Sequence, residues 1–258
     1  MDFSFPNLQA LTSAKTSPLN ERVEVFVLTH GSKPSISMQT LKAMGIPFTR
    51  YDNLDWAFPA DHPELQVDRS VRPGVRGYAL RQYRAFKGHQ AILAQADRAK
   101  HTLVFEDDMS LAADVTPEMV VQHLNAAPRL LDRFDAVSFH ARNQSNGWHS
   151  TGLYGREYVE LQPKQLQGQA DWGHAFFLKP VIEGYNGKYA RLGFKWHEGC
   201  LAYMINSHGR AKWVKAGHGG GMPCDLFLAN ELNTIVLRDS IFLHDERHGS
   251  LISGTVKK

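Results

Sequence analysis

Several features are scarce or missing in this sequence of 258 residues. Only two cysteines occur, Cys200 and Cys224, which are too few for a disulfide framework or a zinc cluster. We expect both thiols to be reduced and buried. No apolar run approaches the roughly 18 residues of a membrane helix, and the first residues lack the basic and apolar regions of a signal peptide. These absences predict a soluble, cytoplasmic protein without a transmembrane segment, whose 43% hydrophobic residues are enough to bury a core.

Two common nucleotide-binding motifs are also missing. The chain contains neither Gly-x-Gly-x-x-Gly nor the Walker A pattern. Their absence disfavours a dinucleotide-dependent oxidoreductase and a P-loop kinase.

Positive charge is concentrated in one stretch, although the net charge is only +3. Residues 69–87 contain six cationic side chains and no carboxylate; they are Arg69, Arg72, Arg76, Arg81, Arg84 and Lys87. Such a stretch is either a solvated helix face or a contact for an anionic ligand such as a phosphate.

The first half of the chain has the pattern of an α/β fold. The stretch "VEVFVLTHG" (23–31) is nearly continuous in apolar residues, as in a strand buried on both faces. A helix is predicted over 35–45, ending at Gly45, and a second strand over 46–53. A long helix over 77–100 leads into a third strand, "HTLVFEDD". This order predicts a Rossmann-like domain with a mostly parallel central sheet.

The remaining elements complete one predicted domain over residues 23–253. It is flanked by an irregular segment, 1–22, and a tail, 254–258. Further strands are predicted at 135–141, 174–180 and 240–246, and further helices near 116–126, 199–208 and 225–232.

The stretch "LVFEDDM" (103–109) places three consecutive carboxylates directly after a buried strand. Adjacent carboxylates repel one another unless a cation compensates their charge. Oxygen ligands suit Mg²⁺ or Mn²⁺, and open α/β sheets bind ligands at the carboxyl ends of their strands. The pattern therefore predicts a metal site that includes Asp108; the alternative is a loop of exposed acids.

The same stretch resembles the acidic motif of a known enzyme family. "HTLVFEDDMSL" is similar to the metal-binding motif of GT-A glycosyltransferases, in the form found in glycosyltransferase family 25, the lipooligosaccharide and collagen galactosyltransferase-like group. Further similar stretches follow in the family's order: "GHQAILAQADRAKHTLVFEDD", "GCLAYMINSHGRAKWV", "MPCDLFLANEL" and "LRDSIFLHDERHGSLIS". Gly88 replaces the family's Ser before His89, Arg84 and Ala85 replace its Gly-Cys pair, and residues 142–198 have no counterpart.

The resemblance implies a GT-A fold and a metal-dependent, inverting transfer of a sugar from a nucleotide-sugar donor, UDP-linked by preference. It implies that Asp108 binds Mn²⁺ or Mg²⁺ and that His244 completes the coordination, although a lone histidine is as often a hydrogen-bonded core residue. Glu106 is a second candidate ligand, and Glu106 or Asp107 orients the donor.

The donor and the catalytic base have further candidates. We expect the donor to lie over Thr29, His30 and Gly31, with Tyr51 and Asp52 near its base and ribose and with Arg76, Arg81 and Arg84 near its diphosphate. Tyr51 could instead be an interior residue. Asp225 is the first candidate for the base, with a helix N-cap as its alternative role, and Asp171 is the second.

The acceptor stays open at this point. A surface glycan such as lipooligosaccharide is the first hypothesis. The alternatives are a hydroxymethylated base in duplex DNA, for which the cationic stretch would contact phosphates, and a carbohydrate- or nucleic-acid-binding module without catalysis. No protein partner can be inferred.

Overall fold

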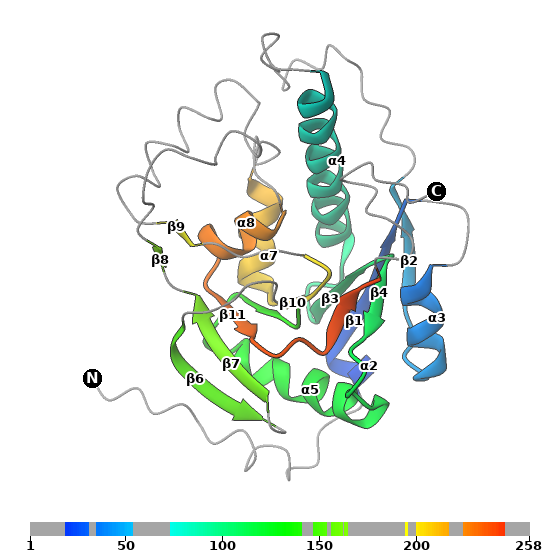
Figure 1. Cartoon of the computed structure of the whole chain (residues 1–258), viewed down its shortest axis with the longest axis vertical. Coiled ribbons are helices and arrows are strands. Elements are labelled where there is room, and N and C mark those ends of the chain that lie inside the picture. The colour runs from blue at the N-terminus through cyan, green and yellow to red at the C-terminus, as the bar shows by residue number, and fades with distance from the viewer. Residues whose placement is uncertain are drawn as a thin grey trace.

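The computed structural model describes residues 19–30, 35–53, 73–140, 147–153, 156–161, 163–164, 194–195, 200–216 and 224–245. These residues form an α/β structure around one large sheet (Figure 1). Among the described helices, none combines the length and apolar character that crossing a bilayer requires.

The central sheet has eight strands in the order β2-β1-β3-β10-β5-β11-β7-β6. Its strands are β1 (Val23–Thr29), β2 (Thr49–Asp52), β3 (His101–Glu106), β5 (Ala136–Ser138), β6 (Gly147–Leu153), β7 (Arg156–Leu161), β10 (Ala202–Ile205) and β11 (Thr234–Leu237). The pairings of β1 with β2, β1 with β3 and β5 with β11 are parallel, and the other four are antiparallel. The sheet is therefore mixed, because β10 and β7 run against their neighbours; the prediction of a mostly parallel sheet holds best for β2, β1 and β3.

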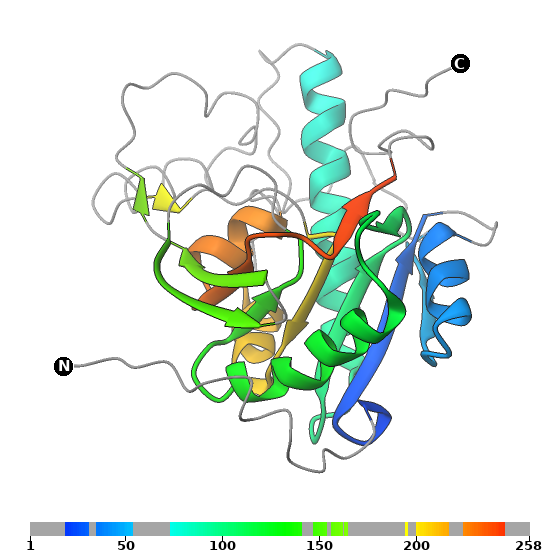
Figure 2. The same cartoon turned by 60° about the horizontal axis from the view of Figure 1, so that its bottom comes forward.

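Helices cover both faces of this sheet (Figures 1 and 2). On one face, α3 (Ile36–Ala43) and α5 (Pro117–Leu130) pack on Val25 and Val27 of β1. On the other face, α4 (Pro73–Gln95) packs on Phe26 and Leu28, and α7 (Ser207–Lys215) and α8 (Cys224–Asn230) pack beside α4 in the same core. Both faces of β1 are thus buried, as its continuous apolar sequence predicted.

Local signals set the ends of two helices. The Ser35 side chain accepts a hydrogen bond from the Met38 N–H at the start of α3. After this helix, Gly45 has φ +67, a left-handed conformation that favours glycine, so the predicted stop is confirmed. Helix α5 begins with an N-capping Thr116 followed by Pro117, whose missing N–H would have no partner there.

The prediction of a helix over 199–208 is wrong. Residues 202–205 form β10, which is paired on both edges and buried on both faces. Its four apolar residues fill the space between β3 and β5, and the helix α7 begins only after Asn206, whose side chain accepts from the Gly209 N–H. A short apolar run cannot by itself distinguish a buried strand from a helix.

Other parts of the predicted pattern were incomplete. The stretch predicted as irregular ends in a short helix, α2 (Leu19–Arg22), and strands β6, β7 and β11 were not predicted. Two small sheets were also missed: β4 (Met109–Leu111) pairs with β12 (Phe242–His244), and β8 (Pro163–Lys164) pairs with β9 (Phe194–Lys195). The predicted strand over 174–180 lies outside the described residues.

Candidate functional site

The candidate site lies where the strand order changes direction. From β1 the chain passes through α3 to β2 on one side, and then through α4 to β3 on the other side of β1. The carboxyl ends of β1 and β3 are therefore neighbours at a point from which the following helices diverge. Open α/β sheets bind ligands at such switch points.

Three side chains predicted as metal ligands meet at this edge. Glu106 ends β3, Asp108 lies in the turn between β3 and β4, and His244 ends β12. One ligand atom from each lies within 4.8 Å of the others, and His244 Nδ1 is 3.0 Å from Asp108 Oδ2. All three side chains are partly buried.

Pairing of β4 with β12 brings His244 to the acidic turn. His244 lies opposite Met109 in the antiparallel register, and the Asp245 N–H donates to the Asp108 carbonyl at 2.8 Å. This contact joins residues that are more than 130 positions apart in the sequence. The meeting of the three candidate ligands therefore depends on the small sheet as well as on β3.

Ser37 holds the backbone of the acidic turn in place. Its buried hydroxyl donates to the Glu106 carbonyl and accepts from the Met109 N–H at 2.8 Å. One side chain from the first turn of α3 thereby bridges both ends of the turn. Sequence reasoning missed Ser37, since a serine near a helix start carries no signal of such a distant contact.

The donor-side candidates at the end of β1 contact the same turn. The His30 N–H donates to Asp107 Oδ2 at 3.0 Å. Burial, together with the charges of Asp108 and Glu106, raises the pKa of Asp107 to about 6. Burial also lowers the pKa of His30. Gly31 lies outside the described residues.

The end of β2 carries a second polar group. The Thr29 hydroxyl donates to the Asp52 carboxylate, which also accepts from Arg50 Nε at 2.8 Å. The hydrogen bond from Thr29 and then that from Arg50 lower the pKa of Asp52. Tyr51 is half-buried and packs against the core beside α4, so its ring is in part an interior group.

Arg84 lies close to the site but is engaged by the backbone. Its guanidinium donates to the Asn53 carbonyl from Nε at 3.1 Å and from Nη2 at 2.6 Å, and Asn53 Nδ2 donates back to the Arg84 carbonyl at 3.0 Å. Its charge contributes to the lowered pKa of His30, which places it near the end of β1. Arg76 and Arg81 belong to α4, and their side chains lie outside the described part.

The close approach of α4 to the sheet explains Gly88. A Cβ atom there would lie 2.6 Å from Nδ2 of the buried Asn53 side chain and 3.0 Å from a methyl group of Leu28. A serine at this position, as in the resembling family, would displace Asn53.

The predicted bases are only partly described. Asp225 lies in the first turn of α8, where its Oδ1 accepts from the Leu226 N–H at 2.8 Å. Asp225 is therefore the second residue of α8 and not its N-cap, which was the alternative to a catalytic role. Asp171 lies outside the described residues. The two cysteines are free and buried, as predicted.

Beneath Glu106 lies a buried histidine that was not among the predicted site residues. His89 Nε2 is 3.3 Å from Glu106 Oε1, and His89 Nδ1 is 2.9 Å from the Tyr203 hydroxyl. Burial would lower the pKa of His89, but Cys224 and Glu106 raise it to about 10. Burial would raise the pKa of Glu106, but the hydrogen bond with His89 and the nearby imidazoles lower it.

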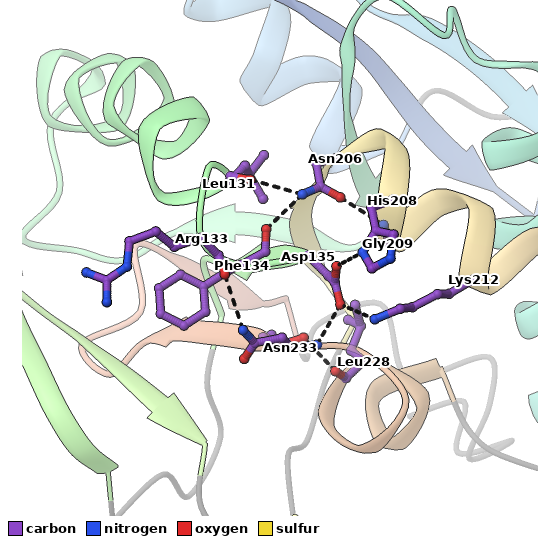
Figure 3. A network of polar contacts seen from close by, with 11 residues as sticks. Leu131, Arg133, Phe134, Asp135, Asn206, His208, Gly209, Lys212, Leu228 and Asn233 are labelled. Atoms are coloured by element: carbon purple, nitrogen blue, oxygen red, sulfur yellow. Dashed lines mark hydrogen bonds and ion pairs between the residues drawn. The ribbon is translucent and has the colours of Figure 1, made fainter. Parts of the chain in front are cut away.

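A second polar cluster surrounds Asp135, directly before β5, at the opposite end of the strands from the acidic turn (Figure 3). The Asp135 carboxylate accepts from His208 Nδ1 at 2.6 Å, from Lys212 Nζ at 2.7 Å and from the Asn233 N–H at 2.9 Å. These contacts join β5 to α7 and to the start of β11. With three partners on its two oxygens, this carboxylate stabilises the fold.

The donor set at Asp108 fits a divalent cation. Asp108 Oδ1 is buried and has no hydrogen-bond partner among the described residues. A buried carboxylate oxygen without a partner is costly unless a cation compensates it. Two carboxylates and one imidazole also match the ligand preferences of Mn²⁺.

Comparisons with known proteins add no assignment. No protein-family model matches the chain, and no curated protein is significantly similar to it. The resemblance to glycosyltransferase family 25 stays a prediction that rests on the quoted motifs. The site has to be interpreted from its own geometry.

Proposed function

We propose that the protein is a divalent-metal-dependent glycosyltransferase that moves a sugar from a nucleotide-sugar donor, UDP-linked by preference, to an acceptor hydroxyl. The observation that carries this proposal is the meeting of Glu106, Asp108 and His244 at a topological switch point, where Asp108 Oδ1 is buried and has no partner in the described part of the chain. Such an arrangement favours an enzyme over a module that only binds carbohydrate.

Glu106, Asp108 and His244 would hold the ion. When bound, Mn²⁺ or Mg²⁺ supplies positive charge for the diphosphate that is released with the nucleotide. The chain contributes preorganisation, because Ser37 fixes the turn backbone and β12 fixes His244 before any substrate arrives.

The residues at the ends of β1 and β2 would bind the donor. Asp52, held by the hydroxyl of the buried Thr29, offers an exposed carboxylate at the end where the ribose of a nucleotide would lie. Asp107, positioned by the His30 N–H, lies on the same side. These carboxylates can accept hydrogen bonds from sugar hydroxyls, which suits a nucleotide sugar.

The transfer itself requires a base. In an inverting reaction the acceptor oxygen forms a bond to the anomeric carbon while the bond from that carbon to the diphosphate oxygen breaks, and the hydroxyl proton passes to a carboxylate. Asp225 and Asp171 stay the candidates for that carboxylate. A surface glycan is the proposed acceptor, by the family resemblance.

The test is nucleotide release from a panel of nucleotide sugars by the purified full chain, with and without Mn²⁺. We expect metal-dependent release, lowered more than about 100-fold by Asp108→Asn, because this change removes a ligand charge where negative charge develops. The matched control is Asp132→Asn, the same change at an exposed aspartate. Release without metal, or equal release by both variants, would contradict the proposal.

The acceptor is tested separately, with neutral glycans and with hydroxymethylated duplex DNA. Transfer to glycan alone supports the proposed acceptor. Transfer to DNA that falls steeply with salt would instead identify a DNA-modifying enzyme.

A further inference from the structure

His89 occupies an unusual position for a charged or polar side chain. It is fully buried, and it lies on the face of α4 that packs under the end of β3. Both ring nitrogens have partners: Glu106 Oε1 at 3.3 Å from Nε2, and the Tyr203 hydroxyl at 2.9 Å from Nδ1. A carboxylate oxygen can only accept, so Nε2 carries the proton and donates to Glu106.

Aromatic packing fixes the plane of the His89 ring. The Tyr203 and Trp213 rings stack with centroids 5.5 Å apart, and His89 lies 5.5 Å from the first and 5.8 Å from the second. Tyr203 belongs to β10, which pairs directly with β3. The imidazole therefore has little freedom to turn away from Glu106.

Glu106, in contrast, has a long side chain at the end of its strand. Three rotatable bonds leave its carboxylate many orientations unless something selects one. The Asp108 side chain is shorter, and its carboxylate lies 3.0 Å from His244 Nδ1, whereas the described partner of the Glu106 carboxylate is His89.

We propose that His89 is a positioning residue, which holds the Glu106 carboxylate in the orientation needed to bind the divalent ion, with Tyr203 holding His89 in turn. This inference rests on the metal site of the proposed function. It extends that site to a buried chain from Glu106 through His89 to Tyr203. Partners of metal ligands typically change metal affinity by 10- to 100-fold when they are removed.

The experiment measures Mn²⁺ affinity directly, from the electron paramagnetic resonance signal of free Mn²⁺ titrated with the full chain, without donor or acceptor. His89→Phe keeps a ring and removes both nitrogens, and we expect Mn²⁺ binding about 10- to 100-fold weaker. His89→Gln keeps a donor near the position of Nε2, and we expect it to recover most of the affinity.

The chain offers a matched control on the other face of the sheet. His123 on α5 is also fully buried, and its Nδ1 lies 2.8 Å from the hydroxyl of the buried Tyr158. His123→Phe should cost stability in the same way but leave Mn²⁺ affinity unchanged. If His89→Phe and His123→Phe weaken Mn²⁺ binding equally, the effect is general destabilisation and the proposal is wrong.

Tyr203→Phe is the second test and applies even if His89→Phe does not fold. It removes only the hydroxyl that orients His89, so we expect a smaller loss of Mn²⁺ affinity, about 2- to 10-fold, while Tyr158→Phe should cause none. If His89→Phe does not fold, wild-type Mn²⁺ affinity in Tyr203→Phe would overturn the proposal.

The outcomes separate this proposal from the proposed function. If the wild type binds no Mn²⁺, both fail, because no metal site exists. If Mn²⁺ binds and depends on His89 while no nucleotide sugar is used, the positioning role stands and the transferase proposal fails. If transfer occurs but Mn²⁺ affinity is unchanged in the His89 variants, only the positioning role fails.

Discussion

Replacing Asp108 by Asn should separate metal binding from folding. The change keeps the size of the side chain and keeps one oxygen that can accept from His244 Nδ1, now 3.0 Å from Asp108 Oδ2. It removes one of three adjacent negative charges. It also makes the carboxylate neutral, one oxygen of which, Oδ1, is buried and has no partner among the described residues.

The expected size of the effect follows from the geometry. Two like unit charges at 4.8 Å, the upper limit of the separations among the three ligand atoms, repel by about 3.5 kcal/mol at an effective dielectric constant of about 20. Removing the Asp108 charge relieves this repulsion, but it also removes the attraction between Asp108 and a protonated His244. Without metal, the free energy of unfolding should therefore stay constant or rise by up to about 3 kcal/mol, which corresponds to a Tm increase of at most roughly 10 °C in a chain of this size.

Metal should stabilise the wild type and have almost no effect on the variant. Mn²⁺ at a hundredfold excess over its Kd stabilises the wild type by about 2.7 kcal/mol, or roughly 5–10 °C in Tm. In Asp108→Asn that shift should nearly disappear.

The assay is thermal unfolding of wild type, Asp108→Asn and Asp132→Asn, each with and without Mn²⁺. Asp132→Asn should respond to metal like the wild type. The reasoning is refuted if Asp108→Asn without metal melts several degrees below the wild type, or if it keeps the full Mn²⁺ shift.

Two further predictions concern stability elsewhere in the fold. Asp135→Asn should lower the free energy of unfolding by about 2–3 kcal/mol, because it turns an amide donor toward Lys212 or His208. Burial would raise the pKa of Asp135, but the hydrogen bonds from Lys212, Asn233 and His208 lower it. The contribution of Asp135 to the free energy of unfolding is therefore present above pH about 4 and is lost as the pH falls through the lowered pKa. A stability difference between wild type and variant that grows in acid would contradict this. Gly88→Ala should cost about 1–3 kcal/mol, against the usual gain from alanine in a helix, because its Cβ meets Asn53. In urea unfolding, adding Asn53→Ala should relieve part of that cost, and strictly additive losses would show that the clash is not the cause.

Much of the fold around β1 could be predicted from the sequence. The continuous apolar run from Val23 to Thr29 indicated a strand buried on both faces, and Gly45 marked the end of the following helix. These signals are local, because burial on both faces demands apolar residues at every position and a left-handed turn demands glycine. The acidic run likewise marked the end of β3.

The predictions from sequence were wrong or incomplete where segments distant in the sequence meet in the fold. "AYMI" at 202–205 reads equally as strand or helix, and its position between β3 and β5 decides for a strand. β10 also makes the sheet mixed, since it runs antiparallel to both neighbours. Its direction depends on its pairing with β3 and β5 in the folded chain. Neither property is contained in four apolar residues.

The candidate site divides in the same way. Glu106 and Asp108 could be recognised from the sequence because three carboxylates after a buried strand require compensation, a local argument from charge. His244 could be named only by resemblance among 13 histidines, and pairing of β12 with β4 is what brings it to Asp108. Ser37 and His89 became visible only in the tertiary structure, because their roles are contacts across 69 and 17 residues that no local pattern records. Composition and spacing indicate which groups must be buried or have their charge compensated. Tertiary packing decides which of the many possible partners in the chain contacts each group.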